Sequence, residues 1–273
     1  MNKFTLKRVV GYLLGFVLFY EPFTLFQKLV GIFIHEPGFT SIHVPCARIP
    51  MQRFLAGDIS TVGHISLFFT ILLIITALWL GPVFCGKLCP AGALPEFLSR
   101  LVPDRFKISW GKSLPIVPIR YGFTLGFLFS TYMGFDSPCP YCNYFAFDLF
   151  INFLHTGKLL TTATSLLVTF TLWFLILGIF TKGGRGYCNF LCPVGAMQSF
   201  FHFVGSFIPG TYGRGVNVQQ CVGCNLCGKI CPMEAITMKE HKCSINIHHC
   251  IECGQCEQVC PKQAISYARR MRS

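Results

Sequence analysis

The sequence predicts a mainly α-helical membrane protein, with four transmembrane helices as two parallel two-helix repeats and a small C-terminal α+β domain. Three observations lead to this fold class: few charged residues, four long apolar stretches and an internal duplication. We expect two domains, a four-helix membrane domain over residues 1–209 and a small cytoplasmic domain over residues 210–273.

Composition is the first of these observations. Among the 273 residues, 52% are hydrophobic and 12% are charged. A soluble domain carries roughly a quarter charged residues, so this composition predicts membrane lipid as the surroundings. The net charge of +12 is explained by basic loops beside anionic lipid. No nucleic-acid-binding motif occurs, which excludes nucleic acid as a partner.

The four apolar stretches are each near the ~20 residues that cross a bilayer as a helix. They cover residues 9–34, 65–84, 116–135 and 163–180. Basic residues lie before the first stretch, between the second and third, and after the fourth, among them Lys3, Arg8, Lys87, Arg105, Lys182 and Arg185. By the positive-inside rule, we expect a multi-pass protein of the cell membrane with both termini in the cytoplasm.

One motif occurs twice in the membrane domain. Residues 84–94 read FCGKLCPAGAL and residues 187–197 read YCNFLCPVGAM, so both carry C-x3-C-P followed by Gly-Ala. Each copy ends a predicted helix pair, which indicates parallel repeats about an axis along the membrane normal. The segment over residues 197–208 is predicted to lie along the inner interface with its phenylalanines facing lipid.

The C-terminal domain carries two copies of the ligand run C-x2-C-x2-C-x3-C-P. This spacing places three thiolates on one iron–sulfur cube and the fourth on a second cube. It predicts a ferredoxin-like domain with two [4Fe–4S] clusters. The first cluster takes Cys221, Cys224, Cys227 and Cys260, and the second takes Cys231, Cys250, Cys253 and Cys256. Zinc also accepts four thiolates, but it explains neither the repeated C-x2 step nor the prolines. Cys243 lies outside the pattern and is interpreted as a spare thiol.

The two C-x3-C-P pairs could together hold a further cluster. Cys85, Cys89, Cys188 and Cys192 would supply four thiolates if the repeat brings the pairs together. Two alternatives stay open, a docking surface for the tail and a redox-active dithiol. Stable disulfides are disfavoured on the cytoplasmic side.

Three further cysteines fall in the loops predicted to lie on the outer side. Cys46 lies between the first two stretches, and Cys139 and Cys142 form Cys-Pro-Tyr-Cys between the last two. A disulfide or a redox-active dithiol is the expected role, with a metal site as the alternative. Because three is an odd number, at least one thiol is left for another use.

In the order of its motifs the chain resembles the NapH family of membrane-bound quinol dehydrogenase components, which is related to the C-terminal half of NosR. The resemblance rests on four apolar stretches, two C-x3-C-P segments and a C-terminal two-cluster run. It implies that menaquinol or ubiquinol from the quinone pool is oxidised and that electrons pass to a partner iron–sulfur or cytochrome subunit. The outer cysteines are not part of that family's pattern.

Oxidation of a quinol requires acceptors for protons as well as electrons. Histidine or carboxylate near a membrane end can take the protons, and Glu21, His35 and His64 are the candidates. An outer quinol site would lie about 30 Å from the inner face. Electron tunnelling falls steeply with separation, so a quinol at the outer side could not reduce the tail clusters directly. We therefore expect the quinone in the inner half, near the C-x3-C-P pairs.

The sequence thus predicts an iron–sulfur electron-transfer subunit, most readily a quinol dehydrogenase component of an anaerobic respiratory system. Two other functions stay open. One is a reductant carrier that passes cytoplasmic electrons to a dithiol at Cys139 and Cys142, and the other is a redox sensor or assembly factor.

Overall fold

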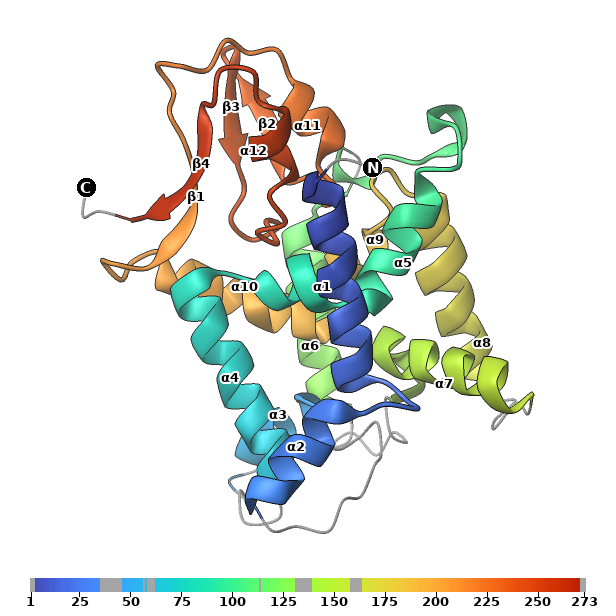
Figure 1. Cartoon of the computed structure of the whole chain (residues 1–273). Coiled ribbons are helices and arrows are strands. Elements are labelled where there is room, and N and C mark those ends of the chain that lie inside the picture. Colours follow the sequence, from blue (N-terminus) through green and yellow to red (C-terminus); the bar gives the residue numbers. More distant parts are fainter. Residues whose placement is uncertain are drawn as a thin grey trace.

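Two parts of the chain pack end to end (Figure 1). Helices over residues 3–205 form a helical body, and short strands and helices over residues 212–269 form a ferredoxin-like tail at one end of it. The structure is a computed structural model that describes residues 3–34, 46–55, 57, 62–112, 114–130, 139–157 and 164–270. The termini of the described chain lie at the end that carries the tail.

The helical body consists of α-helices joined by short π-helical and 3-10 segments. Its α-helices are α1 (Lys3–Phe19), α2 (Leu25–Ile34), α3 (Arg48–Leu55), α4 (His64–Leu80), α5 (Pro90–Ser99), α6 (Ile116–Phe129), α7 (Asn143–Thr156), α8 (Thr164–Phe170), α9 (Gly186–Phe190) and α10 (Pro193–Gly205). The other segments are η1 (Phe84–Leu88), η2 (Asp104–Phe106), η3 (Trp110–Lys112), η4 (Cys139–Tyr141) and η5 (Thr171–Ile179).

Two antiparallel sheets of two strands each form part of the tail. The outer strands β1 (Tyr212–Val216) and β4 (Ile265–Arg269) pair with Tyr212 opposite Arg269, and β2 (Ile236–Lys239) pairs with β3 (Lys242–Ile245). The helices α11 (Leu226–Ile230) and α12 (Gln255–Val259) lie between the sheets in sequence and contact each other. Each helix joins cysteines of one ligand run, so the tail places both runs side by side.

Aromatic side chains fill the core of the helical body. Phe19, Tyr20, Phe69, Phe147 and Trp173 are all buried in one cluster. Rings from different helices meet within it: the ring centroids of Phe19 and Phe69 are 5.1 Å apart, and those of Phe147 and Trp173 are 5.7 Å apart. Such aromatic pairs add favourable edge and offset contacts to the burial of apolar area.

The structure contradicts the prediction of four transmembrane helices. Within the described ranges, no helix combines the length and the apolar character that crossing a membrane requires. A turn at residues 20–24 divides the first apolar stretch into α1 and α2, and the second stretch ends as α4 at Gly81, whose φ is +77°. The third stretch gives the 14-residue α6, and the fourth divides into α8 and η5. Hydropathy cannot separate a buried helix from a spanning one. Some of these residues form the core, such as Phe19, Phe69 and Trp173, and others are exposed.

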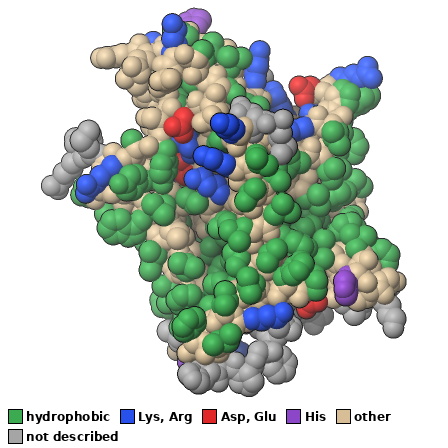
Figure 2. Space-filling model, in the orientation of Figure 1, with side chains coloured by type: hydrophobic (Ala, Val, Ile, Leu, Met, Phe, Trp, Pro, Cys, Tyr) green, Lys and Arg blue, Asp and Glu red, His purple; other side chains and the backbone are tan. Residues whose placement is uncertain are grey.

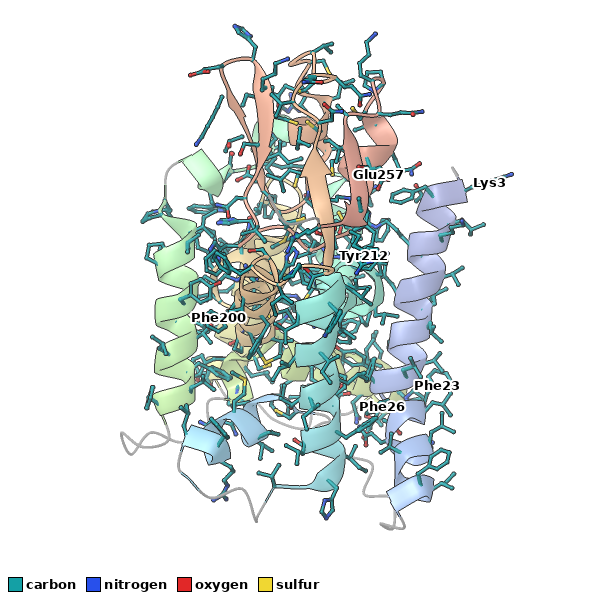
Figure 3. All side chains as sticks on the ribbon, turned by 90° about the vertical axis from the view of Figure 1, so that its left-hand side faces the viewer. Lys3, Phe23, Phe26, Phe200, Tyr212 and Glu257 are labelled. Carbon is teal, nitrogen blue, oxygen red and sulfur yellow. The ribbon has the colours of Figure 1, made fainter. Side chains whose placement is uncertain are left out.

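The predicted multi-pass location in the cell membrane is therefore also wrong, since it depended on those spans. The surface still carries many apolar side chains: Figure 2 shows them over much of one face, below a group of basic residues. Phe33 and Phe207 are examples, with exposed fractions of 82% and 73%. In Figure 3, Phe23 and Phe26 lie at the end of the helical body opposite the tail, where Glu257 is labelled.

Candidate iron–sulfur sites

Four cysteines line one cavity of the tail. We call it the distal site and define it by Cys221, Cys224, Cys227 and Cys260. These are the four cysteines that the crossed pattern assigns to one cube, and Cys224 is the exposed member. Cys243 also lines the distal site, with its Sγ 3.8 Å from that of Cys221. The thiol interpreted as spare therefore lies beside a candidate ligand.

The other four cysteines of the tail line a second cavity. This proximal site is defined by Cys231, Cys250, Cys253 and Cys256. The structure thus sorts the eight cysteines into the two sets that the sequence predicts, and cluster binding by these named residues stays a prediction. Burial raises the pKa of the Cys231 and Cys256 thiols to about 12. A thiolate here therefore needs a bound metal to offset its burial.

The local backbone explains why both runs fold alike. Corresponding residues after the first ligand, Gly223 and Glu252, have φ of +73° and +53°. At the next step Asn225 and Gly254 have φ of +59° and +84°. These left-handed residues turn the chain around each cavity. The fourth cysteine of each run then accepts a backbone hydrogen bond on sulfur, from Ala235 to Cys231 and from Ala264 to Cys260, both 3.3 Å. Such donors stabilise a sulfur ligand and tune the potential of a cluster.

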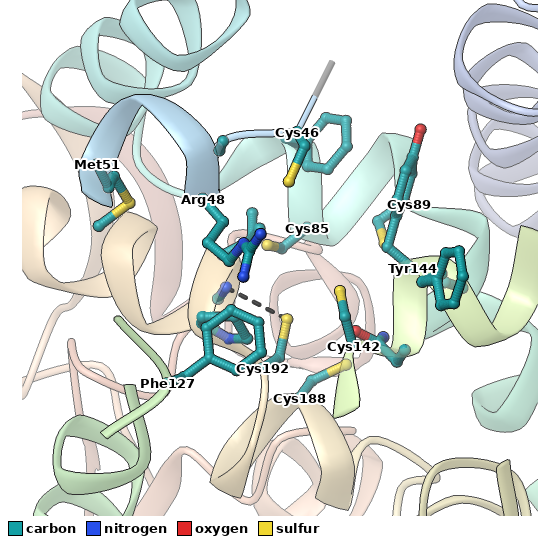
Figure 4. Close-up of a pocket in the computed structure, with 18 of the residues that line it drawn as sticks. Cys46, Arg48, Met51, Cys85, Cys89, Phe127, Cys142, Tyr144, Cys188 and Cys192 are labelled. Atoms are coloured by element: carbon teal, nitrogen blue, oxygen red, sulfur yellow. Dashed lines mark hydrogen bonds between the residues drawn. The ribbon is translucent and has the colours of Figure 1, made fainter. Parts of the chain in front are cut away.

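A larger cavity lies inside the helical body, and we call it the body cavity (Figure 4). Its volume is about 90 Å³, against about 20 Å³ for each cavity of the tail. The duplicated motif delivers all four of its cysteines here, because η1 and α9 present the first of each pair and the chain before α5 and α10 presents the second. The body cavity is lined by Cys46, Cys85, Cys89, Cys139, Cys142, Cys188 and Cys192.

Proline explains the form of both motif copies. Pro90 and Pro193 begin α5 and α10, a position where the missing N–H costs nothing. The preceding cysteines, Cys89 and Cys192, keep an extended backbone at the N-cap. Cys192 Sγ accepts a 3.4 Å hydrogen bond from the amide of Gly195. The start of α10 thus points a free amide toward a sulfur.

Buried guanidinium groups line the body cavity beside the cysteines. Arg120 and Arg185 are each 1% exposed. The glycine of each CPxGA motif makes room for one of them: a Cβ at Gly92 would lie 2.7 Å from Arg185 Nη1, and one at Gly195 would lie 2.8 Å from Arg120 Nη2. The two glycines therefore admit positive charge close to the thiols.

One buried carboxylate joins the helical body to the tail. Glu96 on α5 accepts hydrogen bonds from Arg185 Nε at 2.7 Å, from Arg100 Nη2 at 2.8 Å and from Gln255 Nε2 of the tail at 2.8 Å. Arg8 on α1 is also within 2.9 Å. Burial alone would raise the pKa of Glu96, but the guanidinium groups of Arg185, Arg8 and Arg100 together lower it. Glu96 is therefore a charged clasp between four segments of the chain.

The C-x3-C-P loops pack directly on the proximal site. A Cβ at Gly86 would overlap the carbonyl oxygen of Ile251 and lie 3.0 Å from the amide nitrogen of Cys253. The equivalent residue of the second copy, Asn189, donates a 2.9 Å hydrogen bond to the carbonyl oxygen of Met233. Ile251 lines both the body cavity and the proximal site. The two cavities therefore border on a common residue.

The cysteines predicted to lie on an outer side are inside the molecule. Cys46, Cys139 and Cys142 all line the body cavity together with the C-x3-C-P cysteines. All 16 cysteines have free thiols, so no disulfide joins them. Burial raises the pKa of Cys142 to about 12, whereas a reactive dithiol needs a lowered pKa. This environment argues against an outer reactive dithiol.

Two of the three candidate proton acceptors for a quinol, Glu21 and His64, belong to the described residues. Glu21 accepts a 3.1 Å hydrogen bond from Asn152, and His64 is exposed at the start of α4. Neither is among the residues that line the body cavity. His35 lies outside the described residues.

Sequence reasoning missed the arginines and Glu96. At the level of sequence, Arg8 and Arg185 serve only as basic residues that predict membrane orientation, and Arg120 has no assigned role. A buried Arg cannot be told from an exposed one by sequence alone. The only available signal was a charge inside an otherwise apolar stretch, as at Arg120.

Comparison with known families agrees with this geometry. The family described as "4Fe-4S dicluster domain" matches residues 220–264, which contain all eight ligand-run cysteines. A second family, described as "4Fe-4S binding domain", matches twice, at residues 62–109 and 165–211. Each of these segments contains one C-x3-C-P pair. This chain is therefore similar to 4Fe-4S proteins in its tail and around both C-x3-C-P pairs. The NapH type is a finer assignment that these matches do not reach.

Curated relatives of this iron–sulfur protein come from an archaeon and a bacterium. "Uncharacterized protein MJ0750" of Methanocaldococcus jannaschii is 30% identical over 60% of this chain and 64% of its own length. "Putative electron transport protein YccM" of Escherichia coli is 24% identical over 73% of this chain and 56% of its own. "Uncharacterized protein MJ0749" of the same archaeon is 29% identical over 86% and 76%. The chain thus spans less than two thirds of the first two relatives. No solved structure matches.

Proposed function

We propose that this protein is a single-electron relay with three four-cysteine sites in a row. The row runs from Cys85, Cys89, Cys188 and Cys192 in the body cavity, through the proximal site, to the distal site and its exposed Cys224. When bound, a [4Fe–4S] cluster supplies a carrier that takes up and releases one electron. The shared lining residue Ile251 is the observation that carries this proposal.

Contact between the two parts keeps the first two sites close. Met233, Ala235, Ile251 and Cys253 form one buried cluster, and Cys85 and Cys188 of the helical body pack against it. Electron tunnelling falls steeply with separation, so this dry contact favours exchange between the body cavity and the proximal site. The backbone contact at Gly86 and the hydrogen bond of Asn189 hold it in place.

The row of sites also has a defined outlet. Cys227 and Cys231 lie on or beside α11, and Cys256 and Cys260 lie on or beside α12, so each helix joins the proximal site to the distal site. Cys224 brings the distal site to the surface. A partner redox protein would exchange electrons there.

The finer part of the proposal names the electron donor and acceptor. We infer exchange with the quinone pool and transfer to a partner iron–sulfur or cytochrome subunit. The resemblance in motif order to NapH-type quinol dehydrogenase components supports this part, and so does the printed name of the Escherichia coli relative, an electron transport protein. An anaerobic respiratory role follows from the same resemblance.

Iron analysis of the full chain tests the third site. After anaerobic reconstitution with ferrous iron and sulfide, the double variant Cys85→Ser with Cys188→Ser should lose about four irons per chain, because a cube holds four. Electron paramagnetic resonance of the dithionite-reduced protein should still show the two tail clusters.

Met197→Leu is the matched control, since it changes a buried side chain of the helical body that lines none of the three cavities. It should keep the iron content of the unaltered protein. Equal iron in the double variant and in this control would show that the C-x3-C-P pairs hold no cluster.

Duroquinol tests the donor separately. Added without oxygen, it should bleach the visible absorbance of the reconstituted protein and should bleach much less in the double variant. An unaltered protein that stays oxidised with duroquinol, yet is reduced by dithionite, would contradict the quinol donor and leave the relay in place.

A further inference from the structure

We propose that Cys46, Cys139 and Cys142 hold a second iron–sulfur centre in the body cavity, separate from the one at the two C-x3-C-P pairs. None of these three cysteines falls in a segment matched by a 4Fe-4S family. They come from two separate places in the chain: Cys46 precedes α3, whereas Cys139 and Cys142 flank η4 just before α7. The fold nevertheless brings them to one space.

The body cavity is larger than either cavity of the tail, with a volume of about 90 Å³ against about 20 Å³. Seven cysteines line it. Four of these belong to the C-x3-C-P pairs, which leaves three thiols without an assigned use.

The sulfur atoms point toward one another. Figure 4 shows the thiols of Cys46 and Cys142 directed into the cavity from different elements, facing Cys89 and Cys192 across it. Cys142 interacts electrostatically with both Cys46 and Cys139. Three cysteines can bind the same cluster only if their side chains border a common space. Cys46, Cys139 and Cys142 meet that condition, because all three line the body cavity.

Buried positive charge without a full set of partners indicates an anionic occupant. Arg120 is 1% exposed, and its Nε and Nη2 have no hydrogen-bond partner among the described residues. Arg48, which begins α3 two residues after Cys46, likewise has Nε and Nη1 buried and unpartnered within the described chain. Leaving such buried groups unpaired is unfavourable, and no described Asp or Glu lines the cavity to offset it.

The charges match two centres better than one. Arg120 interacts with Cys192, Cys85 and Cys188, whereas Arg48 interacts with Cys46. In the second set, the interaction with Arg48 is made by Cys46. On binding, each cysteine loses its thiol proton to solvent and forms one iron–sulfur bond, with no change in the oxidation state of its sulfur. Three cysteines ligate three irons of a cube, so the fourth iron takes a ligand other than cysteine.

Additive loss of iron tests this second centre. Four forms of the full chain are reconstituted anaerobically with ferrous iron and sulfide: unaltered, Cys46→Ser/Cys139→Ser/Cys142→Ser, Cys85→Ser/Cys89→Ser/Cys188→Ser/Cys192→Ser, and the combination of all seven changes. With about four irons per cube, we expect roughly sixteen, twelve, twelve and eight irons per chain. Acid-labile sulfide should fall in parallel.

Met51→Leu is the matched control, because Met51 lines the same cavity and the change conserves volume. It should leave the iron content unchanged. The resonance signal of the reduced tail clusters reports in every form that the chain is folded.

Two outcomes would overturn the proposal. If the triple variant keeps all of its iron, the three cysteines bind no cluster. If the triple, quadruple and combined variants all lose the same four irons, the cavity holds one centre of mixed ligation. The first result leaves the proposed relay intact, because the relay uses the four C-x3-C-P cysteines and is tested by the quadruple variant.

Discussion

Gly86 shows how one residue can set the distance between two sites. It lies in the first C-x3-C-P loop, against the backbone of Ile251 and Cys253 in the tail. Any side chain there must push the loop away from the proximal site, because the opposing atoms belong to backbone and cannot rotate aside. The glycine is therefore explained by close approach and not by an unusual φ.

We predict that Gly86→Ala weakens the contact between the two parts. Overpacking of this kind costs about 1–3 kcal/mol, so the thermal unfolding midpoint should fall, and the magnetic interaction between reduced clusters should weaken. The control is Gly122→Ala in α6, where a Cβ meets no atom within 4 Å. Equal behaviour of both variants in calorimetry and in electron paramagnetic resonance would contradict the role of Gly86.

His202 predicts an acid-sensitive stability. Burial, together with the nearby positive charge of Arg270, lowers its pKa from 6.5 to about 3. The ring is therefore neutral, accepts a 2.8 Å hydrogen bond from Arg270 on Nε2, and forms no ion pair with Glu252 at 3.7 Å. As pH falls through 6.5, His202 is protonated in the unfolded chain but stays neutral in the folded chain. The free energy of unfolding should then decrease, by about 2 kcal/mol at pH 5.

His202→Gln should reduce this dependence, because glutamine offers Arg270 an acceptor that does not titrate between pH 5 and 8. The unfolding midpoint of the reconstituted protein is compared at pH 7.5 and pH 5 for both forms. An identical shift in the two forms would contradict this prediction. It would show that the protonation of His202 does not differ between the folded and the unfolded protein, and that other groups control the acid response.

At the level of elements, α5 carries the junction between the two parts. It begins at Pro90 beside a candidate ligand and presents Glu96 one and a half turns later to α1, α12 and Arg185. Since the carboxylate is 1% exposed, its charge depends entirely on these partners. The same short helix thus positions a thiol and fastens the tail.

Glu96→Gln should destabilise the protein strongly. The change leaves three guanidinium groups near a neutral amide, and breaking a buried pair in this way costs about 3–5 kcal/mol. Glu257→Gln is the control, because the ion pair of Glu257 with Arg214 is 35% exposed on the carboxylate side and a pair of that kind contributes about 1 kcal/mol or less. Urea unfolding of both variants measures the difference, and similar losses would contradict the clasp.

The sequence predicted the local chemistry of these elements but not their surroundings. Ligand spacing in the two runs depends on neighbouring residues, so it sorted eight cysteines into the sets that the structure also shows. The predicted membrane topology placed Cys46, Cys139 and Cys142 about a bilayer's thickness from the C-x3-C-P pairs. The structure places all seven in one cavity. Hydropathy reports that a side chain avoids water, and it does not report what covers the side chain.

Across the whole molecule, bound iron and sulfide should supply much of the stability of the tail. Its strands hold only 4 or 5 residues each. One of its two small hydrophobic cores consists largely of cysteines, with Cys221, Cys227, Cys243 and Cys256 among its buried residues. A domain this small has little apolar area to bury, and metal binding then becomes part of the folding free energy.

Removal of iron with a chelator should therefore expose residues 212–269 to protease while more of the helical body stays protected. Adding zinc alone should not restore protection, because the described residues include no group of three or more His, Cys, Asp or Glu placed to hold a single metal ion. Ferrous iron with sulfide should restore it. Full recovery with zinc would favour mononuclear sites in the tail.

The single exposed thiol of the distal site, Cys224, leaves one corner of that centre open to water. Dissolved oxygen meets this corner before it can meet anything behind Ile251. Damage in air should consequently proceed from the surface inward: the outermost centre should be degraded while the innermost ones remain intact. The position that lets a partner reach the chain is thus also its most vulnerable point.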